Sequence, residues 1–198
     1  MTALTRTIAV LLALGLLGSG CGDDDDEKAE REAPPAERAD PPAKPPAGWR
    51  TVRNVRAGFT IAAPLPWSAV TRRGRTTLRS DDRLVAVAVS ADRTSRGRKL
   101  SAAQYARRTI RTVPDFAGIV GRRVSRVPGS RYRSAVVTAT GTVSPSNLSQ
   151  RISVVIFQRP GRVSYGLLVF RNAGVKPRFN DPIISRMLRT FRAQPGSR

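Results

Sequence analysis

Residues 152–170, ISVVIFQRPGRVSYGLLVF, carry the clearest pattern of secondary structure in the sequence. Two apolar runs, Ile152–Phe157 and Val163–Phe170, flank the sequence Arg159-Pro160-Gly161-Arg162. Pro-Gly at the centre of a turn suits type II geometry, because glycine accepts the positive φ that the turn requires. The stretch therefore predicts two antiparallel strands joined by a short turn.

Segments nearer the N-terminus also show the alternation of residue types that is typical of strands. Arg75–Ser80 and Arg83–Ser90 flank Asp81-Asp82, and this arrangement predicts a second hairpin. In the segment 83–90, apolar residues occupy both alternating faces, which is typical of a central strand that is covered on both sides. Further strands are expected at 57–61 and 132–143.

Two helices are expected between and after these strands. Ser101 followed by Gln104 forms the pattern of a capping box, and the residues after it repeat an apolar face at helical spacing. A second helix lies near the C-terminus, where Asp181 can cap it and Pro182 suits its first position. The sequence also allows this helix to begin near Pro177 and to bend at Pro182.

The order of these elements is strands, helix, strands and helix. This order predicts an α+β fold, in which an antiparallel sheet of about six strands has two main helices packed against it. The residues 48–198 are expected to form one domain, since no second linker and no internal repeat interrupts them.

A short motif near the start of this domain is similar to a known family. Gly58-Phe59-Thr60-Ile61, followed by Pro64 and Trp67, resembles the opening of PsbP-like domains. The resemblance continues more loosely through the central hairpin, the middle helix and the closing helix. It implies a non-catalytic binding or accessory role and no particular ligand.

The pattern of the N-terminal residues 1–20 is typical of an export signal. The apolar run Ile8–Leu17 is too short for the roughly 20 residues that a membrane-spanning helix needs. Gly18, Ser19 and Gly20 then lead to Cys21, the only cysteine. This ending resembles the lipobox of bacterial lipoproteins, although Gly18 stands where an aliphatic residue is usual.

The lipobox resemblance implies that the thiol of Cys21 receives a diacylglycerol and that the chain is cut before it. Two acyl chains anchor a protein stably, so we expect the protein at the cell membrane, on its extracytoplasmic face. Two alternatives remain open, namely an ordinary signal peptide that leaves a free thiol and a signal that is retained as a membrane anchor.

Residues 21–47 are expected to form the lipidated cysteine and a disordered tether. The segment 22–47 contains three Pro-Pro pairs, nine acidic and four basic residues, and no aliphatic side chain larger than alanine. Such a composition cannot bury enough apolar surface to fold. We interpret the segment as a stalk that separates the domain from the membrane.

The residue types in the domain disfavour catalysis. The chain has no histidine, which is the most common general acid–base and the most common metal ligand. Its single cysteine leaves no set of zinc ligands, and the domain has only five carboxylates. We therefore expect no enzyme activity, no metal and no cofactor.

The charge of the domain is strongly unbalanced. Residues 48–198 contain 30 Lys and Arg against 5 Asp and Glu, a net charge of +25, whereas the tether has a net charge of −5. The functional interpretation is an anionic partner, such as anionic lipid, a wall polymer or an acidic envelope protein. The alternative is an arginine-biased composition with a solvated basic surface.

Clustering in the sequence indicates where such a basic face lies. The candidates for anion binding are Arg107, Arg108, Arg111, Arg122, Arg123 and Arg126. Nucleic acid is disfavoured as the partner, because the export signal places the domain outside the cell and no nucleic-acid-binding motif occurs. The predicted function is a membrane-anchored, non-enzymatic binding module, and the alternative is a carrier or sensor of a small hydrophobic ligand.

Overall fold

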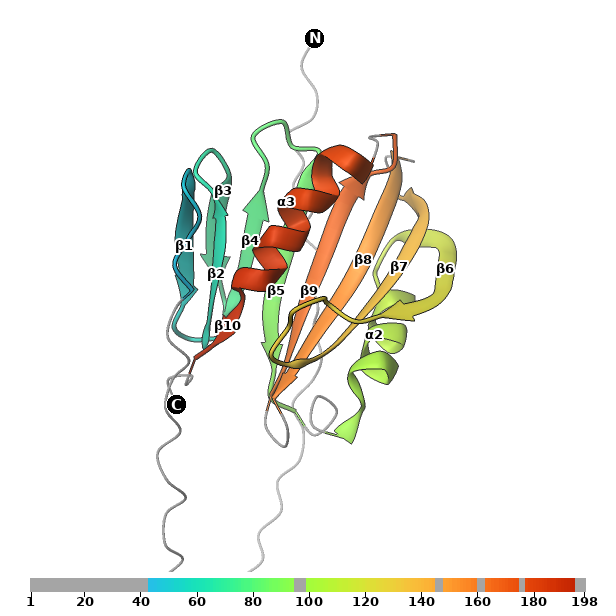
Figure 1. The fold of residues 1–198 in the computed structure, drawn as a ribbon. Coiled ribbons are helices and arrows are strands. Elements are labelled where there is room, and N and C mark those ends of the chain that lie inside the picture. The colour runs from blue at the N-terminus through green and yellow to red at the C-terminus, as the bar shows by residue number, and fades with distance from the viewer. Residues whose placement is uncertain (1–42, 95–98, 145–147, 160–162, 175–176, 195–198) are drawn as a thin grey trace, which may run out of the picture. The chain divides into compact units, whose positions relative to one another are not determined.

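The computed structural model describes residues 43–94, 99–144, 148–159, 163–174 and 177–194 (Figure 1). The strands are β1 (Trp49–Asn54), β2 (Phe59–Pro64), β3 (Ser68–Arg72), β4 (Arg75–Arg79), β5 (Val85–Asp92), β6 (Phe116–Ser125), β7 (Arg133–Val143), β8 (Leu148–Arg159), β9 (Val163–Asn172) and β10 (Arg192–Ala193). The main helices are α2 (Ala102–Arg111) and α3 (Pro177–Thr190). The predicted signal peptide, Cys21 and most of the predicted tether lie outside the described residues.

The strands form two sheets. The smaller sheet has the order β1-β2-β10, and the larger sheet has the order β3-β4-β5-β9-β8-β7-β6. All the described pairings are antiparallel. The predicted hairpin of β8 and β9 is present, with Ile152 opposite Phe170 and Arg159 opposite Val163, although its turn centre lies outside the described residues.

The structure corrects the predicted fold class. An α+β fold with one sheet of about six strands is wrong, because the described chain is mostly β and has a three-stranded and a seven-stranded sheet. The predicted strands correspond to β2, β4, β5, β7, β8 and β9, which are the interior strands of the two sheets. The four strands at the sheet edges, β1, β3, β6 and β10, were not predicted.

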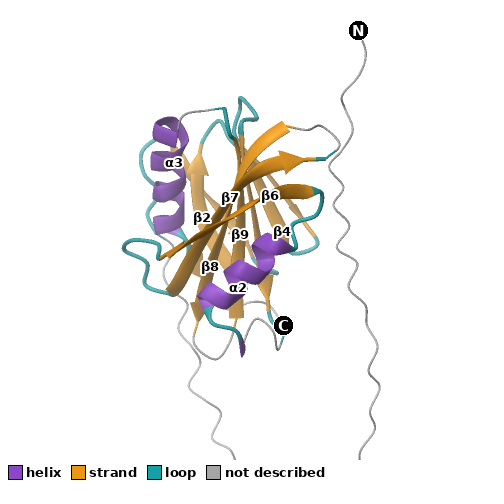
Figure 2. Cartoon of the chain, turned by 90° about the vertical axis from the view of Figure 1, so that its right-hand side faces the viewer, coloured by secondary structure: helices purple, strands orange, loops and turns teal. Residues whose placement is uncertain are grey.

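The larger sheet is covered on both faces. On β8, Val155 and Phe157 belong to a core shared with α3 and the smaller sheet, whereas Ile152, Val154 and Ile156 belong to a core shared with α2. Successive strand residues point to opposite faces, so the two helices lie on opposite sides of the sheet (Figure 2). This double burial explains why β8 is apolar on both faces.

Aromatic rings fill the core on the α3 side. The ring of Phe191, which is 1% exposed, stacks on Phe157 at a centroid distance of 4.8 Å. Tyr165, Tyr132 and Phe59 surround it at 5.2, 5.8 and 6.0 Å. The residue thus joins the end of α3 to both sheets, and the space between them is packed with side chains.

The predicted start of the first helix is confirmed, and of the two starts that the sequence allows for the second helix, the structure has the one at Pro177. At α2, the side chain of Ser101 accepts from the amide of Gln104, and the Gln104 side chain accepts from the Ser101 amide, as in a capping box. The C-terminal helix begins at Pro177, so Asp181 lies within α3 and Pro182 lies inside it. The Asp181 carboxylate pairs with Arg171 of β9 and does not cap the helix.

Candidate functional site

The structure separates the arginines that the sequence groups together. Arg107, Arg108 and Arg111 are exposed on α2. Arg126 lies beside α3, on the other side of the larger sheet. Arg122 and Arg123 lie in β6, and their side chains are outside the described part of the structure. An anion-binding role for these residues stays a prediction.

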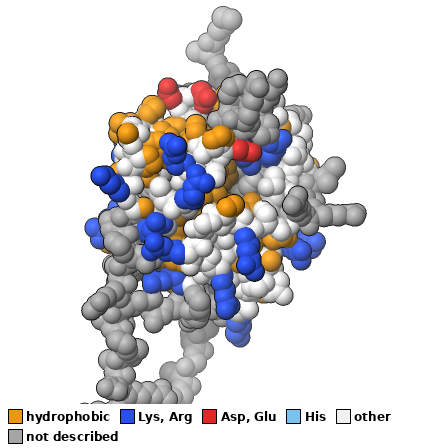
Figure 3. Space-filling view, in the orientation of Figure 1, with side chains coloured by type: hydrophobic (Ala, Val, Ile, Leu, Met, Phe, Trp, Pro, Cys, Tyr) orange, Lys and Arg blue, Asp and Glu red, His pale blue; other side chains and the backbone are white. Residues whose placement is uncertain are grey.

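A different set of arginines converges in space. An open concavity with a volume of about 700 Å³ lies where the β1–β2 turn, the β3–β4 turn and the end of β5 meet. Its lining includes four arginines, one or more from each of these segments, namely Arg56, Arg73, Arg75 and Arg93. We call this feature the arginine concavity. On the face of the molecule in Figure 3, basic side chains are widely spread and acidic side chains are few.

The β3–β4 turn fixes the position of two of these arginines. Arg72 is directly opposite Arg75, so Arg73 and Gly74 form a two-residue hairpin loop. Both loop residues have positive φ, 49° at Arg73 and 78° at Gly74, as a type I′ turn requires. A non-glycine residue in this region costs of order 1–3 kcal/mol, so the arginine at this position is energetically unfavourable for the fold.

A buried asparagine holds the two turns together. Asn54, which is 2% exposed, accepts from the Ala57 amide at 2.9 Å and thereby shapes the β1–β2 turn that carries Arg56. The Asn54 amide donates to the Gly74 carbonyl at 3.2 Å and to the Thr76 hydroxyl at 2.9 Å. These hydrogen bonds hold the backbone of both turns in place, and the backbone in turn positions the arginines that the turns carry.

Arg56 and Arg93 contact these turns directly. A guanidinium nitrogen of Arg93 donates to the Arg56 carbonyl at 3.2 Å, which connects the end of β5 to the β1–β2 turn. The aliphatic part of Arg56 lies over Gly74, where a Cβ atom would be 3.9 Å from two of its carbons. The charged ends of the two side chains thus border one concave surface.

The charge of the concavity is not neutralised by the described residues. Among them, none of the four arginines forms an ion pair with a carboxylate. Arg72 and Arg75 also place like charges directly opposite each other, which is unfavourable for strand pairing. Guanidinium groups donate to phosphate and carboxylate oxygens in a planar, bidentate geometry. The concavity therefore has the chemistry of a site for an anion.

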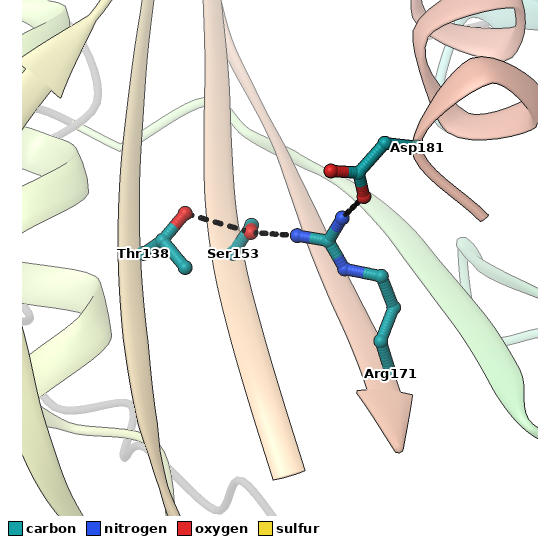
Figure 4. Close-up of polar contacts among 4 residues, drawn as sticks. All are labelled: Thr138, Ser153, Arg171 and Asp181. Atoms are coloured by element: carbon teal, nitrogen blue, oxygen red, sulfur yellow. Dashed lines mark hydrogen bonds and ion pairs between the residues drawn. The ribbon is translucent and has the colours of Figure 1, made fainter. Parts of the chain in front are cut away.

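A second polar cluster, between β7, β8, β9 and α3, is internally neutralised (Figure 4). Arg171, whose side chain is 11% exposed, pairs with Asp181 and donates to the Ser153 hydroxyl at 2.7 Å. The Ser153 hydroxyl is also 2.8 Å from that of Thr138. Burial lowers the pKa of Arg171, and Asp181 opposes this effect. The cluster holds α3 to the sheet and leaves less free charge than the arginine concavity.

Two of the five carboxylates of the domain, Asp82 and Asp92, accept hydrogen bonds from nearby residues. Asp82 accepts from Ser80 and from the Leu84 amide in the β4–β5 turn, and these hydrogen bonds lower its pKa. Asp92 accepts from the Tyr105 hydroxyl and from Thr94. Within the described ranges, no group of three or more His, Cys, Asp or Glu residues is arranged to hold a metal ion. Among the described helices, none is a candidate for a membrane-spanning segment.

Comparison with known proteins supports the fold. No protein-family model matches the sequence, and no curated protein is significantly similar to it. A mutant of the protein Mog1 is 7% identical and has a TM-score of 0.53, with 74% of this chain and 96% of that chain covered. The domain therefore has a Mog1/PsbP-like fold, in agreement with the motif at Gly58–Trp67.

Two further solved structures are similar with lower TM-scores. The Ran-binding protein Mog1p of Saccharomyces cerevisiae is 7% identical, with a TM-score of 0.48 and coverage of 72% of this chain and 94% of that chain. A protein from Bacteroides thetaiotaomicron is 11% identical, with a TM-score of 0.48 and coverage of 74% of this chain. The chain spans about half, 49%, of the length of that bacterial protein.

Replacement of Arg73 by glycine separates the stability of the turn from its charge. We expect Arg73→Gly to raise the free energy of unfolding by about 1 kcal/mol, because glycine adopts the positive φ without strain but loses about 0.5–1 kcal/mol more conformational entropy on folding. The same change should weaken anion binding several-fold. Urea denaturation and a binding titration with inorganic polyphosphate measure the two effects. A variant that is less stable, or that binds with unchanged affinity, would contradict this account of the turn.

Proposed function

We propose that the protein is a non-enzymatic binding module, held by lipid on Cys21 at the extracytoplasmic face of the membrane, that docks onto an anionic envelope partner. The arginine concavity is the docking surface. The observation that carries this proposal is the convergence of four arginines from three separate segments without a neutralising carboxylate in the described structure.

The absence of catalysis is supported by the residue types and their contacts. The chain has no histidine, and Asp82, Asp92 and Asp181 are engaged in local hydrogen bonds or an ion pair. None of these three carboxylates lines the arginine concavity. A general acid–base needs a titratable group within hydrogen-bond reach of the reacting atom. Among the described residues that line the concavity, the side chains with polar groups are the four arginines and Ser90.

The alternative of a hydrophobic-ligand carrier has weaker support. The aromatic rings around Phe191 fill the core between the sheets, and the groove beside α3 has a volume of only about 200 Å³. This groove also contains the charged pair of Arg171 and Asp181. Sites for drug-sized ligands are usually apolar clefts of about 300–1,000 Å³.

Fractionation of a lipoprotein-processing bacterium tests the anchor. The full chain is expected in the membrane fraction and should be released by detergent but not by high salt, because two acyl chains hold it there. The variant Cys21→Ser should leave the membrane fraction. Wild-type protein in the cytosol, or an unmodified sulfur on Cys21 by mass spectrometry, would overturn the anchoring part of the proposal.

Titration with inorganic polyphosphate tests the docking part. Binding should be measurable at about 50 mM salt and should weaken steeply toward about 200 mM, because each contact releases counterions. The measurement is made by calorimetry on the full chain in a zwitterionic detergent. No binding at the lower salt concentration would overturn the proposed function.

A further inference from the structure

The strand β3 is an open edge of the larger sheet. It pairs with β4 on one side, and no described strand pairs with it on the other. All five of its residues, Ser68–Arg72, are exposed. An open edge presents unpaired N–H and C=O groups to which another extended chain can add.

The hairpin turn determines which amides point outward. The residues that flank a two-residue hairpin loop, here Arg72 and Arg75, are the pair that closes the turn by hydrogen bonds. Hydrogen-bonded and non-hydrogen-bonded pairs alternate along an antiparallel ladder. The amides of Ala69 and Thr71 are therefore directed away from β4, toward the open side.

The other three sheet edges carry features that discourage strand addition. The pairing of β6 is interrupted by a register shift between Val120 and Val124, and β10 has only two residues. The edge strand β1 carries Arg50 and Arg53 within its length. Bulges, short length and charges are the usual protections of edge strands. Each of the edges formed by β1, β6 and β10 thus has at least one of these protections.

The middle of β3, Ala69–Thr71, carries no charge and no bulge. It has no proline, lysine or register shift, and Val70 is 50% exposed at its centre. Its only charge, Arg72, lies at the end that joins the arginine concavity. A strand that adds to β3 would place its side chains beside Val70 and beside the guanidinium groups at the turn.

We propose that β3 accepts an extended, acidic segment of an envelope protein by antiparallel or parallel strand addition. Opposite charges on neighbouring strands are favourable, so acidic residues of the added strand would pair with Arg72 and with the concavity. A second copy of this chain is disfavoured, because each copy carries a net charge of +21. The proposal rests on the proposed function, since the concavity supplies the charge that selects an acidic strand.

The test uses an eight-residue peptide that alternates valine and aspartate. The variant Ala69→Pro removes an outward N–H without changing the ladder to β4, and Ala69→Thr is the matched control that keeps this N–H. Fluorescence anisotropy with the full chain should show that Ala69→Pro weakens peptide binding at least about tenfold, while Ala69→Thr does not. Polyphosphate binding should be unchanged in both variants.

Each outcome separates this inference from the proposed function. Equal peptide affinity in Ala69→Pro and Ala69→Thr would overturn strand addition, while polyphosphate binding would still support the docking function. A second outcome is that the unmodified chain binds the peptide, that Ala69→Pro loses this binding, and that the unmodified chain does not bind polyphosphate. This outcome would support strand addition and overturn the docking function. A dimer of the free chain in sedimentation that Ala69→Pro dissociates would identify a second copy as the occupant and overturn the acidic-segment proposal.

Discussion

Replacement of the four concavity arginines by glutamine should weaken polyphosphate binding about a thousandfold at low salt. The residues are Arg56, Arg73, Arg75 and Arg93. An arginine near an anionic surface contributes about 1 kcal/mol, and about 1.4 kcal/mol corresponds to a factor of ten in affinity. The four contributions add to about 4 kcal/mol because the side chains border one surface and can bind one anion together.

A matched variant distinguishes this site from the general charge of the domain. Arg107, Arg108, Arg111 and Arg133 are exposed outside the concavity, so their replacement by glutamine removes the same charge. At the same salt concentration of about 50 mM, screening already limits the effect of such distant charges, and we expect less than a tenfold loss. Calorimetric titration compares the two variants. Equal losses would show that net charge, and not the concavity, accounts for binding.

Replacement of Phe191 by alanine should lower the free energy of unfolding by about 3–5 kcal/mol. The side chain is 1% exposed, and its ring contacts aromatic residues from β2, β8 and β9. Alanine would leave a cavity between the two sheets that these rings cannot close. Such a loss is a large part of the roughly 5–15 kcal/mol that stabilises a typical domain.

Urea denaturation measures this effect against a control. Phe116→Ala, at a half-buried position near the start of β6, should cost clearly less because its side chain is already partly in water. A loss of less than about 1 kcal/mol for Phe191→Ala, or a loss no larger than that of the control, would contradict the central place of this ring in the core.

The sequence predicts the interior strands because burial imposes a pattern on them. β5 and β8 pair with strands on both sides. β8 is covered on both faces and β5 has one buried face, so their apolar residues are continuous or alternate clearly. The capping box at Ser101 is equally local, since a helix start depends on residues that are close in sequence. Both signals are visible without knowledge of tertiary contacts.

The edge strands carry no such pattern, which explains the incorrect fold class. All of β3 is exposed, and β10 has only two residues. β6 contains a glycine at 118 and, in the structure, a register shift that interrupts its alternation, so its sequence is typical of a connecting segment. The partner strand supplies the hydrogen bonds that make each of them a strand. Propensity alone does not reveal an element of this kind, because tertiary context decides it.

The arginine concavity could not be predicted from spacing. Arg56 and Arg93 are 37 residues apart and meet only because the smaller sheet packs against β4 and β5. One local signal was available, since Arg73-Gly74 between two polar runs indicates a tight hairpin turn with glycine at a positive φ. Clustering along the chain instead favoured Arg107, Arg108 and Arg111, which share one helix and do not border the concavity.

The most direct test of anion docking follows the Nε–H resonances of ¹⁵N-labelled arginines by NMR during a titration with inorganic polyphosphate. We expect the resonances of Arg56, Arg73, Arg75 and Arg93 to shift and saturate at the lowest concentrations, because these four groups border the anion site. Shifts that begin at the arginines of α2, or that rise equally at every exposed arginine, would contradict the proposed site.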